Sequence, residues 1–137
     1  AEQVLALNEP DIAIDIQPRS GPVVIELDYL IDPADAQAFH LAMQELGGAR
    51  KRNGGFNWTL ARDIGDERRW IERFHCPTWG DYLRTRDRFT QADMVLFDSI
   101  LAFNRAPEGL TVRRMLERPS GSISEIPPQE EIRYIAP

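Results

Sequence analysis

Seven side chains between positions 58 and 86 are of the types that build a small-molecule site. Trp70, Glu72 and Phe74 alternate along the chain, so in a strand all three would lie on one face. A carboxylate held between aromatic rings has a raised pKa, which suits a general base. The resulting ligand-binding candidates are Trp58, Trp70, Glu72, Phe74, Trp79, Tyr82 and Arg86.

A structural role for the same residues is the interpretation that we favour. In this interpretation the aromatic rings belong to the hydrophobic core, and Glu72 forms an ion pair with an arginine, Arg86 being one candidate. The reason is that no histidine, metal site or nucleophile accompanies Glu72. We therefore assign no catalytic residue.

The remaining reactive side chains predict neither a metal site nor a nucleophile. His75 and Cys76 are adjacent, and strand neighbours point to opposite faces of a sheet. His40 has Gln44, which is not a metal ligand of the usual kind, one helical turn later. Cys76 precedes Pro77 at a strand end and is expected to be a small buried hydrophobe. The sequence predicts no metal and no cofactor.

A hairpin is expected to carry most of the candidates. Residues 56–63 and 69–76 have the composition and alternation of two strands, with Gly65 and Asp66 in the turn between them. Pro77 ends the second strand. The spacing of Thr78 and Asp81 then predicts a capping box that begins a helix.

Further elements surround the hairpin. A strand is predicted over residues 23–31, a helix begins at Asp32 and Pro33, and a last strand covers residues 110–117. Thr90 and Asp93 predict a further helix start. The order strand, helix, strand, strand, helix, strand is the split βαβ arrangement. We therefore expect an α+β, ferredoxin-like fold, in which helices cover one face of a four-stranded antiparallel sheet.

The domain is expected to span residues 22–117. Residues 1–21 are predicted to form an extended arm or linker, although Ile12, Ile14 and Ile16 alternate as in a short strand. Residues 118–137 form a C-terminal tail in which residues 132–135 could add one strand. Both faces of the predicted strands carry apolar or aromatic residues, so the face without helices is expected to pair with a second copy as a homodimer.

Bulk composition excludes several classes of protein. The 137 residues suit one domain, and the net charge of −6 argues against nucleic acid as the main partner. One cysteine cannot form an intrachain disulfide. No apolar run approaches the ~20 residues of a membrane span. The chain starts at Ala1, which indicates a processed chain or an excised fragment.

The order and spacing of several short motifs resemble a known family. From residue 32 onward the chain reads DPADA, RKRNG, FNWTL, RWIERF, TWGDYL and RFTQAD. This resembles the C-terminal domain of bacterial major facilitator transporters of the transmembrane secretion effector type, which are related to enterobactin exporters. The resemblance covers residues 22–116. The chain departs from the family pattern in two places. Where the family has HLRQH, residues 82–86 read YLRTR and lack both histidines. The tail after Arg118 is also longer than in the family.

The resemblance implies a dimeric α+β barrel, the fold of antibiotic biosynthesis monooxygenases. It also implies a membrane transporter ahead of Ala1, so that residues 1–21 would link the domain to the last membrane helix. The expected location is then cytoplasmic, attached to the inner membrane through that transporter.

Two functions from different classes follow from this resemblance. The first is an accessory domain of an exporter, which dimerises and binds a small-molecule cargo. The second is a cofactor-free monooxygenase acting on an aromatic or quinone-like substrate. That enzyme would need a polar set in its cavity, for which the chain offers Asn57, Trp58 and His75 on strands that need not share a face. An interaction module without a ligand is a third alternative.

Overall fold

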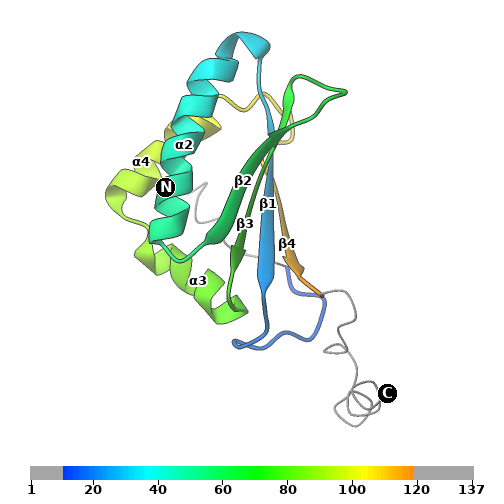
Figure 1. The fold of residues 1–137 in the computed structure, drawn as a ribbon, viewed down its shortest axis with the longest axis vertical. Coiled ribbons are helices and arrows are strands. Elements are labelled where there is room, and N and C mark those ends of the chain that lie inside the picture. Colours follow the sequence, from blue (N-terminus) through cyan, green and yellow to red (C-terminus); the bar gives the residue numbers. More distant parts are fainter. Residues whose placement is uncertain (1–10, 119–137) are drawn as a thin grey trace.

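The computed structural model describes residues 11–118 as a four-stranded antiparallel sheet with helices over one face (Figure 1). The strands are β1 (Val23–Leu30), β2 (Phe56–Arg62), β3 (Arg69–Cys76) and β4 (Thr111–Leu116). The helices are the 3-10 helix η1 (Pro33–Asp35) and the α-helices α2 (Ala36–Arg52), α3 (Trp79–Arg88) and α4 (Gln91–Leu101). The strand order β2-β3-β1-β4 confirms the predicted ferredoxin-like α+β fold.

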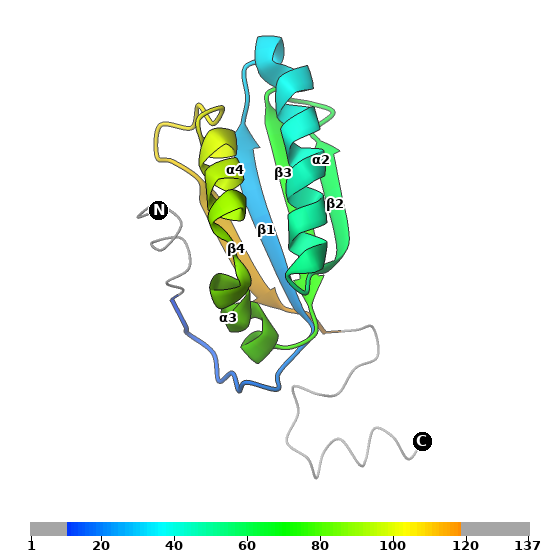
Figure 2. The same ribbon diagram turned by 90° about the vertical axis from the view of Figure 1, so that its left-hand side faces the viewer.

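The register of the two central strands decides which side chains reach the candidate site. β3 pairs with β1 so that Glu72 lies opposite Leu27 and Phe74 lies opposite Ile25. Alternate residues point to opposite faces, so these side chains share the face that α2 and α4 cover (Figure 2). Trp70 is buried on the same face, which confirms the predicted alternation.

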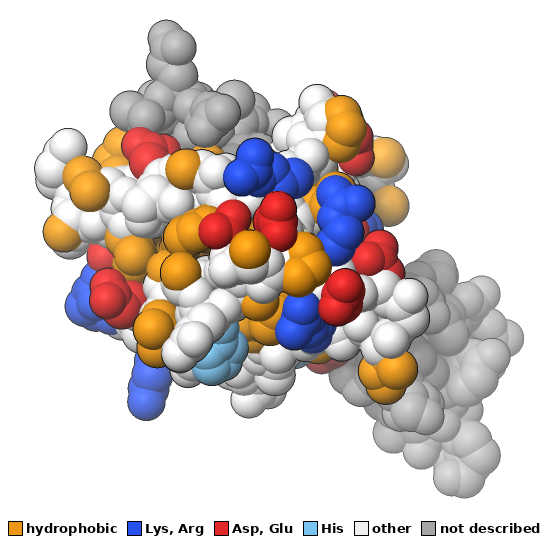
Figure 3. Space-filling view, turned by 90° about the horizontal axis from the view of Figure 1, so that it is seen from above, with side chains coloured by type: hydrophobic (Ala, Val, Ile, Leu, Met, Phe, Trp, Pro, Cys, Tyr) orange, Lys and Arg blue, Asp and Glu red, His pale blue; other side chains and the backbone are white. Residues whose placement is uncertain are grey.

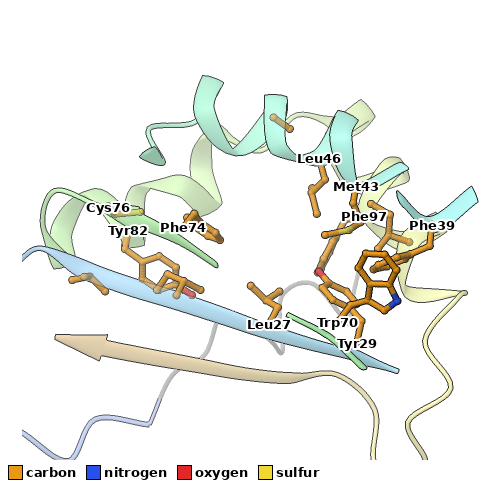
Figure 4. Packing of buried hydrophobic residues seen from close by; sticks show 14 of the residues in the cluster. Leu27, Tyr29, Phe39, Met43, Leu46, Trp70, Phe74, Cys76, Tyr82 and Phe97 are labelled. Carbon is orange, nitrogen blue, oxygen red and sulfur yellow. The ribbon is translucent and has the colours of Figure 1, made fainter. Parts of the chain in front are cut away.

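The core fills the space between this face and the helices. Phe39, Met43 and Leu46 recur at helical spacing along α2 and are fully buried. They point toward Tyr29 and Trp70 of the sheet (Figure 4). The rings of Phe39 and Trp70 meet edge to face, with centroids 5.5 Å apart. These three residues therefore form the apolar stripe by which α2 packs on the sheet.

The start of the first helix differs in detail from the prediction. The Asp32 carboxylate accepts a hydrogen bond from the backbone N–H of Ala34, as a cap should. The turn that it caps is the 3-10 helix η1, however, and α2 begins only at Ala36. Asp32 therefore caps the entry to the helix rather than the α-helix itself.

Threonine caps begin the two following helices at the predicted positions. The hydroxyls of Thr78 and Thr90 accept from the backbone N–H groups of Asp81 and Asp93. The Asp93 carboxylate in turn accepts a hydrogen bond from the backbone N–H of Thr90, which completes a capping box. Asp81 instead accepts from the hydroxyl of Thr78, at 2.8 Å. The second cap is thus a full capping box and the first is a variant of it.

The opposite face of the sheet is more polar than predicted. No helix of residues 11–118 covers it, and its centre holds carboxylates and arginines rather than apolar groups. Glu26 on β1 accepts from Arg73 on β3 and from Arg113 on β4, and Asp28 accepts from Arg113. We call these four residues the outer ion-pair network. Apolar side chains flank it, namely Val24, Ile71 and Met115.

Residues 11–21 run along one end of the fold without forming a strand (Figure 2). Their backbone carbonyls at Pro18 and Ser20 accept from the N–H groups of Gly80 and Trp79. Ile12 and Ile14 are more than half exposed, so their alternation reflects no sheet pairing. The predictions for residues 1–10 and for an added strand at 132–135 lie outside the described residues.

The surface seen along the long axis mixes acidic, basic and apolar side chains (Figure 3). None of the helices within residues 11–118 has both the length and the apolar character that a membrane span needs.

Candidate functional site

A buried carboxylate occupies the centre of the helix-covered face. Glu72 has no exposed surface, and its two oxygens accept from three side chains. The Tyr29 hydroxyl donates at 2.9 Å, the Trp58 indole N–H at 2.9 Å and Arg50 Nε at 3.0 Å. Arg50 Nη2 donates a second, longer bond of 3.3 Å. We call Tyr29, Arg50, Trp58 and Glu72 the Glu72 cluster.

The cluster confirms an ion pair for Glu72 but corrects its partner. The arginine is Arg50 of α2, and not Arg86 of α3. Burial by itself would lower the pKa of Arg50, but the charge of Glu72 and its hydrogen bonds outweigh burial and raise that pKa. Burial, followed by the charge of Glu72, raises the pKa of Tyr29 well above its usual range. At neutral pH the carboxylate therefore faces one cation and two neutral donors.

A glycine in α2 makes room for the indole of the cluster. A Cβ built on Gly47 would lie 2.9 Å from Cδ2 of Trp58, whereas one on Gly48 would meet nothing within 4 Å. Glycine weakens a helix interior by about 1 kcal/mol relative to alanine. Because Gly47 has no side chain, Trp58 packs flat against α2 and reaches Glu72, which offsets the loss of helix stability.

A cavity of about 50 Å³ lies beside the cluster, between the sheet and the helices. Three of its lining residues are arginines and four are aromatic. The lining residues are Ile25, Leu27, Arg50, Asn53, Phe74, Tyr82, Thr85, Arg86, Phe89, Phe97, Val112 and Arg114. Arg50 connects the two features, because its guanidinium also lies 4.7 Å from the ring centroid of Phe74.

The seven predicted candidates fall into three places. Phe74, Tyr82 and Arg86 line the cavity. Trp58 and Glu72 belong to the adjacent cluster. The other two are core residues: Trp70 packs at the far end of α2 against Phe39, and Trp79 packs against Tyr82 with ring centroids 5.4 Å apart.

Sequence reasoning missed several lining residues. Arg50 and Asn53 have the sequence pattern of a helix C-terminus, and no motif singles out Phe97. Arg114 lies inside the strand predicted over residues 110–117, where no motif marks it as a site residue. A signal for it exists in the alternation of Val112, Arg114 and Leu116, because a charge interrupts the apolar face that this spacing defines.

The residues required for the enzyme alternative do not meet in one site. Trp58 lies on the covered face, whereas His75 lies on the other face, where its ring contacts Phe56 and its Nε2 lies 3.1 Å from Glu117. Asn57 is exposed, with a φ of 52° beside the register shift in β2. The three side chains therefore belong to two faces of the sheet.

Cys76 is buried, and burial raises the pKa of its thiol to about 11, so it is protonated at neutral pH. A search of residues 11–118 finds no group of three or more His, Cys, Asp or Glu side chains placed to hold a metal ion.

Sequence comparison connects the chain with a transporter family. A family model described as "Transmembrane secretion effector" matches residues 1–120. Among curated proteins, none matches this sequence.

Structural comparison finds the same fold in several solved proteins. An antibiotic biosynthesis monooxygenase is 17% identical with a TM-score of 0.59, over 71% of this chain and 99% of its own. The cofactor-independent oxygenase SnoaB of Streptomyces nogalater is 12% identical with a TM-score of 0.59, over 70% and 92%. A conserved protein from Methanosarcina mazei Go1 is 7% identical with a TM-score of 0.60, over 70% and 92%. At such identities the likeness extends to the fold alone.

Proposed function

Because this chain belongs to the transmembrane secretion effector family, we propose that it is an accessory domain of a major facilitator-type exporter. In this proposal the domain forms a homodimer, and the cavity between sheet and helices holds a small-molecule cargo. The domain lies on the cytoplasmic side of the inner membrane, attached through the transporter part.

The chemistry of the cavity lining is the observation that carries a binding role. No His, Cys, Asp or Glu lines the cavity within the described residues. Glu72 bonds to the lining residue Arg50, and its oxygens already accept four hydrogen bonds. A general base must reach the proton that it removes, and a fully bonded carboxylate behind the wall cannot do so without breaking the cluster. The lining therefore favours holding a ligand over reacting with it.

The outer face of the sheet supports the homodimer. Ile71 and Met115 leave apolar surface exposed beside the outer ion-pair network and the buried Val24, and this face has no helix over it within residues 11–118. A single four-stranded sheet gains stability when such a face is covered, and a second copy is the commonest cover.

Light scattering tests the dimer directly. We expect about twice the chain mass of 15.7 kDa. An Ile71→Arg variant should dissociate the dimer, whereas Val95→Arg, at a position on α4 that is 61% exposed, should not. A wild-type chain that stays monomeric at tens of micromolar would remove the dimer from the proposal.

Oxygen uptake tests the choice between binding and catalysis. We expect no consumption of oxygen above buffer with a panel of phenols and hydroquinones. Turnover on any of them that Glu72→Gln abolishes, in a variant that remains folded, would replace the accessory-domain proposal by a monooxygenase.

Protease digestion of membrane vesicles that contain the full-length protein tests the cytoplasmic location. We expect the domain to be protected in right-side-out vesicles and cleaved in inverted ones.

A further inference from the structure

The cavity lining has an unusual balance of charge. Arg50, Arg86 and Arg114 contribute guanidinium groups, whereas no carboxylate of residues 11–118 lines it. The whole chain carries a net charge of −6, so a lining with three arginines and no carboxylate from residues 11–118 runs against its overall composition. A concave site lined by one sign of charge attracts ligands of the other sign.

The ion pair with Glu72 removes Arg50 as the main anchor for a ligand. Its Nε and Nη2 both donate to Glu72, so its charge is already matched. What Arg50 offers the cavity is its flat guanidinium stacked on Phe74.

Arg114 differs from Arg50 and Arg113 in the partner that it has. Its Nε donates to the Tyr82 hydroxyl at 2.7 Å, and its guanidinium lies 5.7 Å from the ring centroid of the same tyrosine. Both contacts are with a neutral group. The next residue along β4 toward the N-terminus, Arg113, points to the other face and bonds to two carboxylates. Within residues 11–118 no carboxylate pairs with Arg114, although Asp11 and Asp15 line a second hollow that it borders.

A partly buried guanidinium with only a hydroxyl partner has unused hydrogen-bond capacity. A guanidinium carries five N–H donors in a planar fork that matches a carboxylate. Arg114 uses one of these donors on Tyr82. An anion in the cavity would supply the negative counter-charge that no carboxylate of residues 11–118 supplies to Arg114.

The rest of the wall selects for a flat ligand. Phe74, Tyr82, Phe89 and Phe97 all line the cavity. The volume of about 50 Å³ exceeds the roughly 10–15 Å³ that one water needs, but it is about a third of the roughly 150 Å³ that takes up benzene. A ring therefore enters only when lining side chains move, and a single ring needs a smaller movement than a fused system.

We infer that the cavity selects an aromatic carboxylate with a single ring, whose acid group is bound by Arg114 beside the Tyr82 hydroxyl. This inference rests on the proposed function, because it specifies the ligand class of the same cavity. It makes Arg114 the specificity-determining residue, with the aromatic walls binding the ring in either charge state.

A matched pair of probes tests the inference on the intact wild-type chain. 4-Fluorobenzoate and 4-fluorobenzamide have nearly the same shape, and only the first is an anion. Titration followed by fluorine NMR should give a dissociation constant about tenfold or more lower for the benzoate, as a charge-assisted hydrogen bond predicts. Equal dissociation constants would overturn the charge selectivity, and no binding of either probe would overturn a single-ring ligand. Neither outcome affects the homodimer, which light scattering tests separately.

Variants then locate the selectivity. Arg114→Gln should bring the ratio of the two dissociation constants close to one, while binding of the amide changes by less than about threefold. Arg114→Lys, which keeps the charge, should retain part of the preference. Arg73→Gln removes the same charge from the outer face and should leave the ratio unchanged. An equal loss of preference in Arg114→Gln and Arg73→Gln would refute a role for Arg114 beyond net charge.

Discussion

The two faces of this sheet carry the same kind of ion pair in opposite surroundings. On the covered face, Glu72 of β3 binds Arg50, and their side chains are 0% and 13% exposed. On the outer face, Glu26 of β1 binds Arg73 and Arg113, whose side chains are 54% and 38% exposed. Both carboxylates lie on the two central strands, so the difference lies in what covers them.

Burial decides what each network does for the protein. An ion pair inside the fold must offset the loss of water around both charges, and removal of one partner leaves the other charge unmatched. The Glu26 side chain is itself only 9% exposed, but its arginine partners keep much of their hydration, so we expect each pair to contribute about the 0–1 kcal/mol of an exposed ion pair. The Glu72 cluster should therefore act as a fixed support of the cavity wall, while the outer network adjusts to salt, pH or a second copy.

Substitution of Glu72→Gln should give the largest effect. It leaves Arg50 buried without a counter-charge, and we expect a loss of about 3–5 kcal/mol in the free energy of unfolding. The double variant Arg50→Met, Glu72→Leu removes both charges and should recover most of that loss. Urea denaturation measures both. A loss below about 1 kcal/mol in Glu72→Gln would show that the two networks are equivalent.

Trp58, one of the two neutral donors of the Glu72 cluster, should rank second. Trp58→Phe removes the N–H that donates to Glu72, and a hydrogen bond to a charged group contributes about 1.5–3 kcal/mol. Trp70→Phe is the matched control, because the buried Nε1 of Trp70 has no hydrogen-bond partner to lose among residues 11–118. Urea midpoints should therefore fall further for Trp58→Phe. The reverse order would mean that packing, and not the bond to Glu72, dominates at both sites.

Two adjacent glycines of α2 provide a smaller contrast. Gly47→Ala places a methyl group against the Trp58 ring and should destabilise by about 1–3 kcal/mol. Gly48→Ala meets nothing within 4 Å and should stabilise by up to about 1 kcal/mol through helix propensity. Thermal midpoints that move in the same direction for both would contradict the packing of Trp58 on α2.

The smallest effect is expected from the outer network at neutral pH. Arg73→Gln should change the free energy of unfolding by at most about 1 kcal/mol. Burial would raise the pKa of Glu26, but its hydrogen bonds to Arg73 and Arg113 outweigh burial and lower that pKa below 4.5. The bond from Arg113 lowers the pKa of Asp28 below 3.8.

The sign of the pH dependence follows from these lowered pKa values. A carboxyl with a lower pKa in the folded than in the unfolded state stabilises the fold above its unfolded pKa. That contribution is lost as the pH falls through the folded pKa, so stability should decrease below about pH 4.5. The decrease should be shallower in Arg73→Gln. If the free energy of unfolding fell with the same slope below pH 4.5 in the variant and in the wild type, the Glu26–Arg73 pair would not cause the acid sensitivity.

Local patterns predicted most of the fold because they involve neighbours in sequence. The caps at Thr78 and Thr90, and the faces of Trp70, Glu72 and Phe74, need only spacing and alternation. Ile12 and Ile14 show the limit of that reasoning. Their alternation is strand-like, yet it produces no strand because no neighbouring chain pairs with it.

Contacts between distant elements could not be predicted in the same way. Arg50 reaches Glu72 across 22 sequence positions, from a helix end where a basic residue already had a local explanation. Arg114 lies 32 positions from Tyr82 and sits in the cavity only because β4 pairs with β1 so that Arg114 lies opposite Ile25. Both depend on sheet order and register, which a single sequence does not specify.

Intermolecular NOEs from a bound probe test most directly whether the covered face is the binding face. With 4-fluorobenzoate and isotope-labelled protein, we predict NOEs from the probe ring to Phe74, Tyr82 and Phe97, which line the cavity. NOEs instead to Val24, Ile71 and Met115 on the outer face would contradict the central claim of a ligand held between the sheet and its helices.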